Sequence, residues 1–303
     1  MSESVAKRLR WRDALVAQVL GERRTPVVSN YWLAVQLYKL VFNERTDGRE
    51  LQLPASGPDG RMLAEARNAL LSRNILYQDS ALPSTLFRVK GETMGVPELM
   101  CSIDPFGHVA YLSAMSYHGL TNRLPKVLYF VSPNPALWKE LAREKMLKDL
   151  GSHYDGYIQS GLPKLRHAHL EKLDGVVIEE IRTKDRGGWR SANEGMLRVT
   201  GIGKTFVDML QRQDICGGIR HVLDVFEEHA PLHLSSIIAA FDTHGTAIDK
   251  VRAGYILEEH CGVRSAEVEA WTKFATRGGS RKLDPQAEYS SHFSAKWSLS
   301  LNV

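Results

Sequence analysis

The stretch Gly201-Ile202-Gly203-Lys204-Thr205 contains the residue types best suited to binding a small anion. A Gly-Lys-Thr ending lets a phosphate loop surround an anion with backbone amides and a lysine. Such a loop needs another glycine five residues before the Gly-Lys pair. Arg198 occupies that position, and its side chain would obstruct close approach of the backbone to phosphate. The spacing therefore favours an ordinary helix N-terminus over a nucleotide site.

Acidic residues in the middle of the chain come nearest to a hydrolytic centre. A metal-dependent nuclease needs converging carboxylates and a lysine, and Asp174 followed by Glu180-Ile181-Arg182 approaches that pattern with arginine in place of lysine. One alternative interpretation is therefore a metal-dependent nuclease, delivered to nucleic acid by a winged helix, with Asp174 and Glu180 binding the metal.

Histidine pairs such as His229 and His233 do not supply the three or four converging ligands that zinc needs. Pro231 also interrupts the helix that would align this pair. No Gly-x-Ser-x-Gly nucleophile motif is present. We therefore expect no metal, no cofactor and no catalytic residue, and predict that the chain is not an enzyme.

Length and composition bound the class of protein. With 303 residues and 43% hydrophobic residues, the chain can bury two cores. Its three cysteines are odd in number and far apart, which does not support a disulfide framework. No segment resembles an apolar signal core or approaches the roughly 18 apolar residues of a spanning helix. We predict a cytoplasmic protein of two domains, with no membrane partner.

Helical spacing of apolar residues recurs three times near the N-terminus. It predicts helices over residues 4–20 and 30–43, and a third that opens at Asp59 and stops at Asn74. Runs rich in strand formers follow at residues 75–78 and 86–89, separated by turn residues. Three helices and a hairpin in this order are typical of a winged helix-turn-helix, whose third helix enters the major groove.

Basic and amide side chains beyond the apolar stripe of the third helix can bond to base edges or phosphates. Those of the first helix and the hairpin can add phosphate contacts. The predicted DNA-binding residues are Lys7, Arg8, Arg10, Arg12, Arg61, Arg67, Asn68, Arg73, Arg88 and Lys90.

Helix and strand patterns alternate after Pro97, which predicts domains over residues 1–95 and 96–303. Strand patterns at 127–131, 176–181 and 196–199 accompany a helix over 135–150 and four helices between 205 and 260. The predicted fold class is α+β, with an N-terminal winged helix-turn-helix followed by a larger mixed domain.

Five segments of this second domain resemble the AbiEi family of antitoxins and transcriptional repressors. They are YLSAMSYHGLTNRLPKVLYFVSP at 111–133, GVVIEEIRT at 175–183, RVTGIGKTFVDMLQRQDICGGIRHVLDVFEEHA at 198–230, KVRAGYILEE at 250–259 and SRKLDPQAEYSSHFSAKWSLSLNV at 280–303. The His-Gly-Leu-Thr and Cys-Gly-Gly parts are the more specific. The chain departs from the family at Gly203-Lys204-Thr205, where relatives tend to carry Glu-Arg-Thr.

The resemblance implies the antitoxin of a type IV, AbiE-like toxin-antitoxin system. Such a protein would repress its own operon by binding inverted repeats in promoter DNA. It would oppose a nucleotidyltransferase toxin without forming a stable complex with it. The second domain also contains basic residues that could extend the DNA surface or serve the antitoxin effect. They are Arg123, Lys126, Lys139, Arg143, Lys145, Lys148, Lys164 and Arg166.

Overall fold

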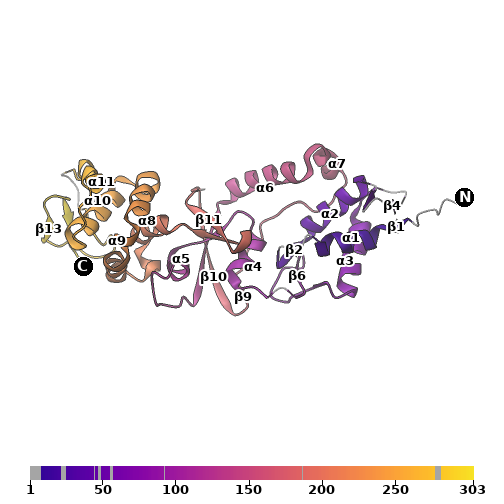
Figure 1. Ribbon diagram of the computed structural model, residues 1–303, viewed down its shortest axis with the longest axis horizontal. Helices are drawn as coiled ribbons and strands as arrows, with labels where there is room; N and C mark the ends of the chain where they lie inside the picture. The colour runs from indigo at the N-terminus through magenta and orange to yellow at the C-terminus, as the bar shows by residue number, and fades with distance from the viewer. Residues whose placement is uncertain are drawn as a thin grey trace, which may run out of the picture. The chain divides into compact units, whose positions relative to one another are not determined.

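The computed structural model describes residues 8–21, 25–43, 45–46, 49–54, 57–91, 93–185, 187–276 and 281–303. Helices and strands are mixed throughout (Figure 1), so the predicted α+β class is confirmed. The chain forms two compact units. The first unit comprises Met1–Gly107 and Ser132–Val176, and the second comprises His108–Val131 and Val177–Val303.

This division differs from the boundary expected between residues 95 and 96. The helix α6 (Pro135–Leu150) belongs to the first unit because its Met146 and Leu150 are buried in the same apolar core as the N-terminal helices. Burial of these side chains removes apolar surface from water. This gain holds α6 in the first unit, although it is far in sequence from the N-terminal helices.

The first unit is mainly helical. Its helices are α1 (Trp11–Gly21), α2 (Asn30–Asn43), α3 (Gly60–Ser72), α4 (Val96–Ile103), α6, the 3-10 turn Gly151–His153 and α7 (Tyr154–Gln159). Its strands are β1 (Leu9–Arg10), β2 (Val27–Ser29), β3 (Arg45–Thr46), β4 (Arg49–Gln52), β5 (Leu76–Tyr77), β6 (Leu86–Val89) and β9 (Lys172–Leu173).

Helix α3 forms where the sequence predicts it. The Asp59 side chain accepts a hydrogen bond from the Met62 amide at 2.8 Å, which caps the helix N-terminus. Apolar residues at helical spacing, among them Met62, Ala66 and Leu70, are buried against α1 and α2. Asn74 adopts the left-handed conformation (φ 56°) and turns the chain into the hairpin.

The predicted hairpin is present as β5 and β6, and a third strand joins it. Strand β2, which no sequence pattern predicted, pairs antiparallel with β6 and places Val28 opposite Phe87. The strand order is β2-β6-β5. The segment between α1 and α2 therefore ties the start of the helical region to the hairpin.

The first predicted helix is wrong at its start, and a strand outside the predicted elements pairs with the segment that precedes it. Helix α1 begins at Trp11, while Leu9 and Arg10 form β1 and pair in parallel with Leu51 and Gln52 of β4. Strand β4 lies between the second and third predicted helices, where the sequence pattern predicted no strand. Burial of Leu51 in the core explains why this short strand forms despite its turn-rich surroundings.

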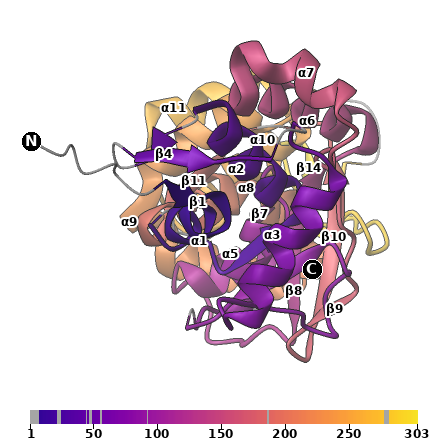
Figure 2. The same cartoon turned by 90° about the vertical axis from the view of Figure 1, so that its right-hand side faces the viewer.

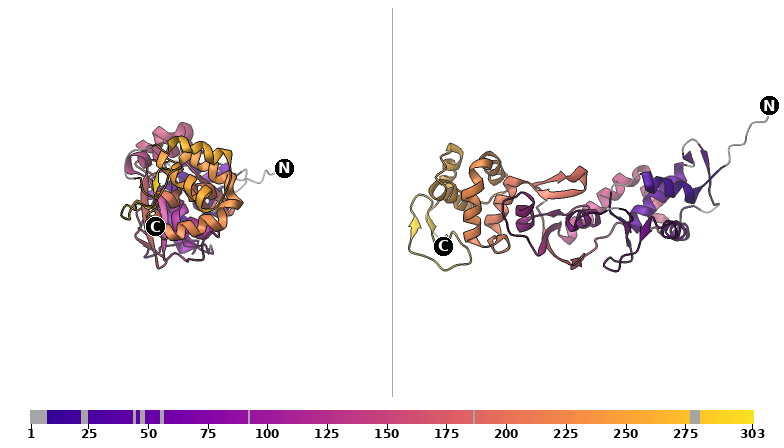
Figure 3. Two further views of the ribbon diagram at one scale, coloured as in Figure 1. Left: turned by 90° about the vertical axis from the view of Figure 1, so that its left-hand side faces the viewer. Right: turned by 60° about the horizontal axis from the view of Figure 1, so that its bottom comes forward.

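The second unit combines a sheet with a helical bundle. The strands β7 (His108–Val109), β8 (Val127–Pro133), β10 (Val176–Thr183), β11 (Trp189–Ala192) and β12 (Leu197–Thr200) are ordered β11-β12-β7-β8-β10. Its helices are α5 (Tyr111–Tyr117), α8 (Ile202–Gln211), α9 (Ile219–His244), α10 (Ala247–Tyr255), α11 (Ala266–Glu269), the π-helical turn Ile256–His260 and the 3-10 turns Asn193–Gly195, Gln213–Cys216 and Ala270–Phe274. Helices α8 to α11 gather in one bundle, coloured orange to yellow in Figure 3.

Two of the predicted helices are joined in α9, with Pro231 inside it and non-helical backbone at His233. Near the end of the chain, the two-residue strands β13 (Phe293–Ser294) and β14 (Leu299–Ser300) pair antiparallel. Within the described part of the chain, none of the helices has the length and apolar character needed to span a bilayer.

Candidate nucleic-acid interface

The exposed face of α3 is narrow and polar. Arg61, Glu65, Asn68 and Ser72 follow one another at spacings of three or four residues, so they lie on one side of the helix. Arg61, Asn68 and Ser72 are exposed or partly exposed, whereas the opposite side is buried. Arg67 lies at the edge of this face. The face thus offers guanidinium, carboxylate, amide and hydroxyl groups in a row.

Glu65 lies between two arginines. Its carboxylate pairs with Arg12 from α1, and its Oε1 lies 3.6 Å from Nε of Arg61 one helical turn earlier. The helical spacing of Arg61 and Glu65 was visible in the sequence, but the approach of Arg12 was not. Exposed pairs of this kind contribute up to about 1 kcal/mol each, so another anion can displace Glu65.

Two more of the predicted cations form surface ion pairs. Arg73 pairs with Asp13 of α1, and Arg8 Nε lies 3.2 Å from Glu50 Oε2. Arg10, Arg67 and Lys90 make no ion pair within the described residues. Lys7 lies outside the described residues. The structure therefore brings α1 and α3 together as one basic surface, partly neutralised by Asp13 and Glu65.

Arg88 does not belong to that surface. Its side chain is only 12% exposed, and Nε donates to Asp79 Oδ2 at 2.7 Å. A second hydrogen bond joins its guanidinium to Asp174, which follows β9. Because two carboxylates already hold this guanidinium, phosphate would have to displace one of them for Arg88 to bind DNA as predicted.

The tip of the β5–β6 hairpin is ordered but not basic. Asp79 Oδ1 accepts from the Ala81 amide at 2.8 Å, and the Gln78 side-chain amide donates to the Leu86 carbonyl at 3.2 Å. No lysine or arginine stands between residues 79 and 85. Only hydroxyls, such as those of Ser80 and Ser84, and backbone amides are available there for phosphate contacts.

The basic residues predicted in the second domain are divided between the two units. Those of the first unit are Lys139, Arg143, Lys145, Lys148, Lys164 and Arg166, and those of the second are Arg123 and Lys126. Figures 1 and 2 show α6 and α7 on one side of α2 and α3 on the other. The cations of α6 therefore do not extend the face of α3.

Two of these cations have partners. Lys145 Nζ lies 3.0 Å from Asp149 Oδ2, which also accepts from the Tyr31 hydroxyl at 2.8 Å. Arg123 donates to the Gly217 carbonyl at 3.2 Å. The other six cations are exposed, namely Lys126, Lys139, Arg143, Lys148, Lys164 and Arg166.

The other sequence motifs have structural partners. Asp174, with positive φ (48°), bonds to Arg88, and Glu180 Oε1 lies 3.2 Å from Arg182 Nε. Among the described residues, no three His, Cys, Asp or Glu side chains are grouped to hold a metal ion.

The Gly203-Lys204-Thr205 motif lies at the start of α8. A Cβ at Gly203 would lie 2.1 Å from the Ser236 carbonyl oxygen. This glycine therefore permits close packing of α8 on α9.

No protein-family model matches the chain, and no curated protein sequence matches it. Among solved structures, the chain is similar to the RV2827C protein from Mycobacterium tuberculosis, with 15% sequence identity and a TM-score of 0.48. The match covers 95% of this chain and 90% of that one.

Proposed function

We propose that α1 to α3 and the strands β2, β5 and β6 are a winged-helix module that binds duplex DNA through α3. The observation that carries this proposal is the combination of the β2-β6-β5 sheet with an uncovered polar face on α3. A helix with its side chains is about 10–12 Å across, and the major groove is about 12 Å wide. The Arg61 to Ser72 face of α3 is the part that would enter the groove.

The side chains on this face match the acceptor and donor pattern of base edges. An arginine such as Arg61 can donate two hydrogen bonds to guanine, and an asparagine such as Asn68 can bond in the same way to adenine. Arg12 and Arg67 flank this face and would contact phosphates, which position the protein without reading sequence. Arg10, exposed on β1, would add a further phosphate contact. Phosphate would compete with Glu65 for Arg12. When DNA binds, a backbone phosphate would replace the Glu65 carboxylate as the partner of Arg12.

We further propose that the protein represses its own promoter in the cytoplasm and is the antitoxin of a type IV, AbiE-like system. The support for this part is the resemblance of the five segments between residues 111 and 303. The partner would be a nucleotidyltransferase toxin, opposed without a stable complex. The alternative of a metal-dependent nuclease gains no support from the geometry of Asp174 and Glu180.

A reporter driven by the DNA upstream of the chain's own coding sequence tests the repressor role. Co-expression of the unaltered protein should lower reporter output, and the double variant Arg61→Ala/Asn68→Ala should restore it. For the antitoxin role, the product of the adjacent gene is expressed with and without this protein, and restoration of growth by this protein is measured. The double variant should still rescue growth, because its substitutions lie on α3. Equal repression by both proteins would contradict DNA reading by α3.

A further inference from the structure

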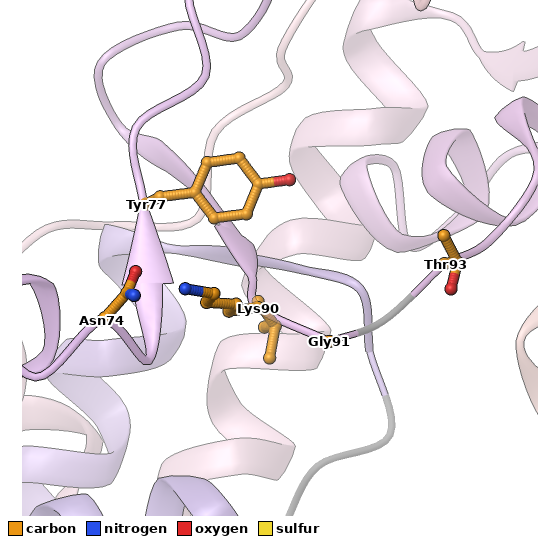
Figure 4. Close-up of a pocket in the computed structure, with 6 residues that line it drawn as sticks. Asn74, Tyr77, Lys90, Gly91 and Thr93 are labelled. Atoms are coloured by element: carbon orange, nitrogen blue, oxygen red, sulfur yellow. The ribbon is translucent and has the colours of Figure 1, made fainter.

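A surface hollow of about 450 Å³ lies on the first unit where α3 ends and the hairpin begins. None of its lining residues belongs to the polar face of α3. Figure 4 shows the side chains that surround it. The lining residues are Asn74, Tyr77, Val89, Lys90, Gly91 and Thr93.

The hairpin itself determines which side chains reach the hollow. Tyr77 follows Leu76 in β5, so its ring lies on the opposite face of the hairpin from Leu76, which is buried. Its cross-strand partner Arg88 shares that face. The Lys90 amide donates to the Ile75 carbonyl at 2.9 Å, which continues the strand pairing by one residue. The Tyr77 ring, 43% exposed, and the Lys90 side chain therefore share the outer face of the hairpin.

Hydrogen-bond donors converge in the hollow. Figure 4 shows the Asn74 amide and the Lys90 ammonium pointing toward one another, with the Tyr77 ring beside them. Lys90 makes no ion pair within the described residues, and none of the six lining residues is acidic. Arg88 on the same face is already neutralised by Asp79 and Asp174. Among the described residues that line the hollow, Lys90 would therefore be the main charged partner of an entering anion.

We propose that this hollow binds a phosphate group with an adjoining sugar or base ring. The phosphate accepts hydrogen bonds from Lys90 Nζ and the Asn74 amide, and the ring lies against Tyr77. Lysine binds phosphate as a compact point charge, and aromatic rings stack on any base. A hollow of this volume lies within the range of small-ligand sites and exceeds the space that a bare phosphate fills.

Two sources can supply this chemistry, the backbone of duplex DNA and a free nucleotide. The DNA source rests on the proposed function, because the hollow would then hold a phosphate beside the groove that α3 enters. The free-nucleotide source does not rest on it. Binding of both a random-sequence duplex and deoxyadenosine monophosphate must therefore be measured on the same variants.

The variants are chosen to keep the backbone unchanged. Lys90→Gln removes the charge and Lys90→Arg retains it. Asn74→Gly removes the amide while favouring the left-handed backbone that Asn74 adopts. Tyr77→Leu removes the ring. Lys273→Gln, an exposed lysine of the second unit, is the matched control for loss of one positive charge. Unchanged thermal unfolding midpoints verify the fold of each variant.

We expect Lys90→Gln to weaken binding of the true ligand roughly tenfold, and Lys90→Arg to restore most of that loss. If Lys90→Gln weakens binding of the duplex alone, and lowers its salt dependence by about one phosphate contact, the DNA backbone is the source. Weakening of monophosphate binding identifies a free nucleotide. In either case Asn74→Gly and Tyr77→Leu should weaken binding of the same probe.

The outcomes separate this inference from the proposed function. If Arg61→Ala/Asn68→Ala weakens duplex binding while Lys90→Gln matches Lys273→Gln for both probes, α3 binds DNA and the hollow does not bind phosphate. If the unaltered protein binds the monophosphate through Lys90 but binds no duplex, the hollow is a nucleotide site and the proposed function fails. Absence of binding to both probes overturns both.

Discussion

The Arg88 guanidinium and the Asp174 carboxylate are hydrogen-bonded to each other although 86 positions separate them in the chain. Asp174 stands with Gly175 in a turn where both residues have positive φ. Because Asp79 holds the same guanidinium, the outer face of the hairpin carries two carboxylates against one arginine. This pairing keeps Arg88 from phosphate and lowers the positive charge of the hairpin.

Replacing Asp174 with asparagine should therefore increase affinity for DNA. An asparagine side chain at this position would tolerate the left-handed backbone, because asparagine is among the residues most often found there. One of the two carboxylates would no longer compete for Arg88, so phosphate could pair with it, and the salt dependence of binding should steepen by about one contact. Titration of a random-sequence duplex at several salt concentrations measures this.

Asp155→Asn is the control, because it removes one negative charge from an exposed position on α7 of the same unit. This variant should change the salt dependence less than Asp174→Asn. Equal effects of the two substitutions would show that net charge alone governs binding and that Arg88 has no direct contact.

Helix α3 could be predicted from the sequence because local signals agree there. Its cap at Asp59, its apolar stripe and its stop at Asn74 all lie within the helix or close to its ends. The surface of α3 could be predicted only in part. The spacing of Arg61 and Glu65 identifies a shared face, but the approach of Arg12 depends on packing of α1 against α3.

The fate of Arg88 could not be predicted, since no pattern links it to Asp174. Strands β1 and β4 were missed for a related reason. Each is short, and their pairing joins residues about 42 positions apart, as in Leu9 with Leu51. Likewise, Met146 and Leu150 have ordinary helical spacing, and only the folded chain places them in the N-terminal core.

The second unit contains a buried ion pair whose disruption should be costly. Lys204 Nζ bonds to the carboxylate of Asp208, which is 4% exposed. Burial raises the pKa of the Asp208 carboxyl, and the nearby Lys204 ammonium opposes that rise. Lys204→Met leaves the carboxylate without its counter-charge and should destabilise the second unit by about 3–5 kcal/mol. Urea-induced unfolding followed by circular dichroism measures the loss.

The double variant Lys204→Met/Asp208→Leu should regain much of this stability, because neither charge is then buried alone. Stability of the double variant at or below that of Lys204→Met would contradict the interpretation of Lys204 as counter-charge to Asp208.

Stability should fall in mild acid because of His108. Burial, followed by the positive charges of Lys204 and Arg198, lowers the pKa of this histidine to about 4 from its ordinary 6.5. Between these values the unfolded chain binds a proton that the folded chain does not. The stabilising contribution is therefore complete above pH 6.5 and is lost as the pH falls toward 4. The loss should amount to roughly 3 kcal/mol.

Unfolding free energies measured from about pH 7 to about pH 4 test this. His108→Gln should remove much of the dependence on pH, whereas His292→Gln, at an exposed position, should retain it. A slope that survives His108→Gln would assign the acid sensitivity to other groups.

We propose that α3 reads base edges, and the specificity ratio of its variants tests this role most directly. Duplexes selected by the unaltered protein from a random library supply the specific probe, and unselected duplexes supply the non-specific one. Asn68→Ala should weaken specific binding by about 1–3 kcal/mol while changing non-specific binding little. Asn122→Ala, at an exposed position of the second unit, should change neither. Equal weakening of both probes by Asn68→Ala would contradict base reading by α3.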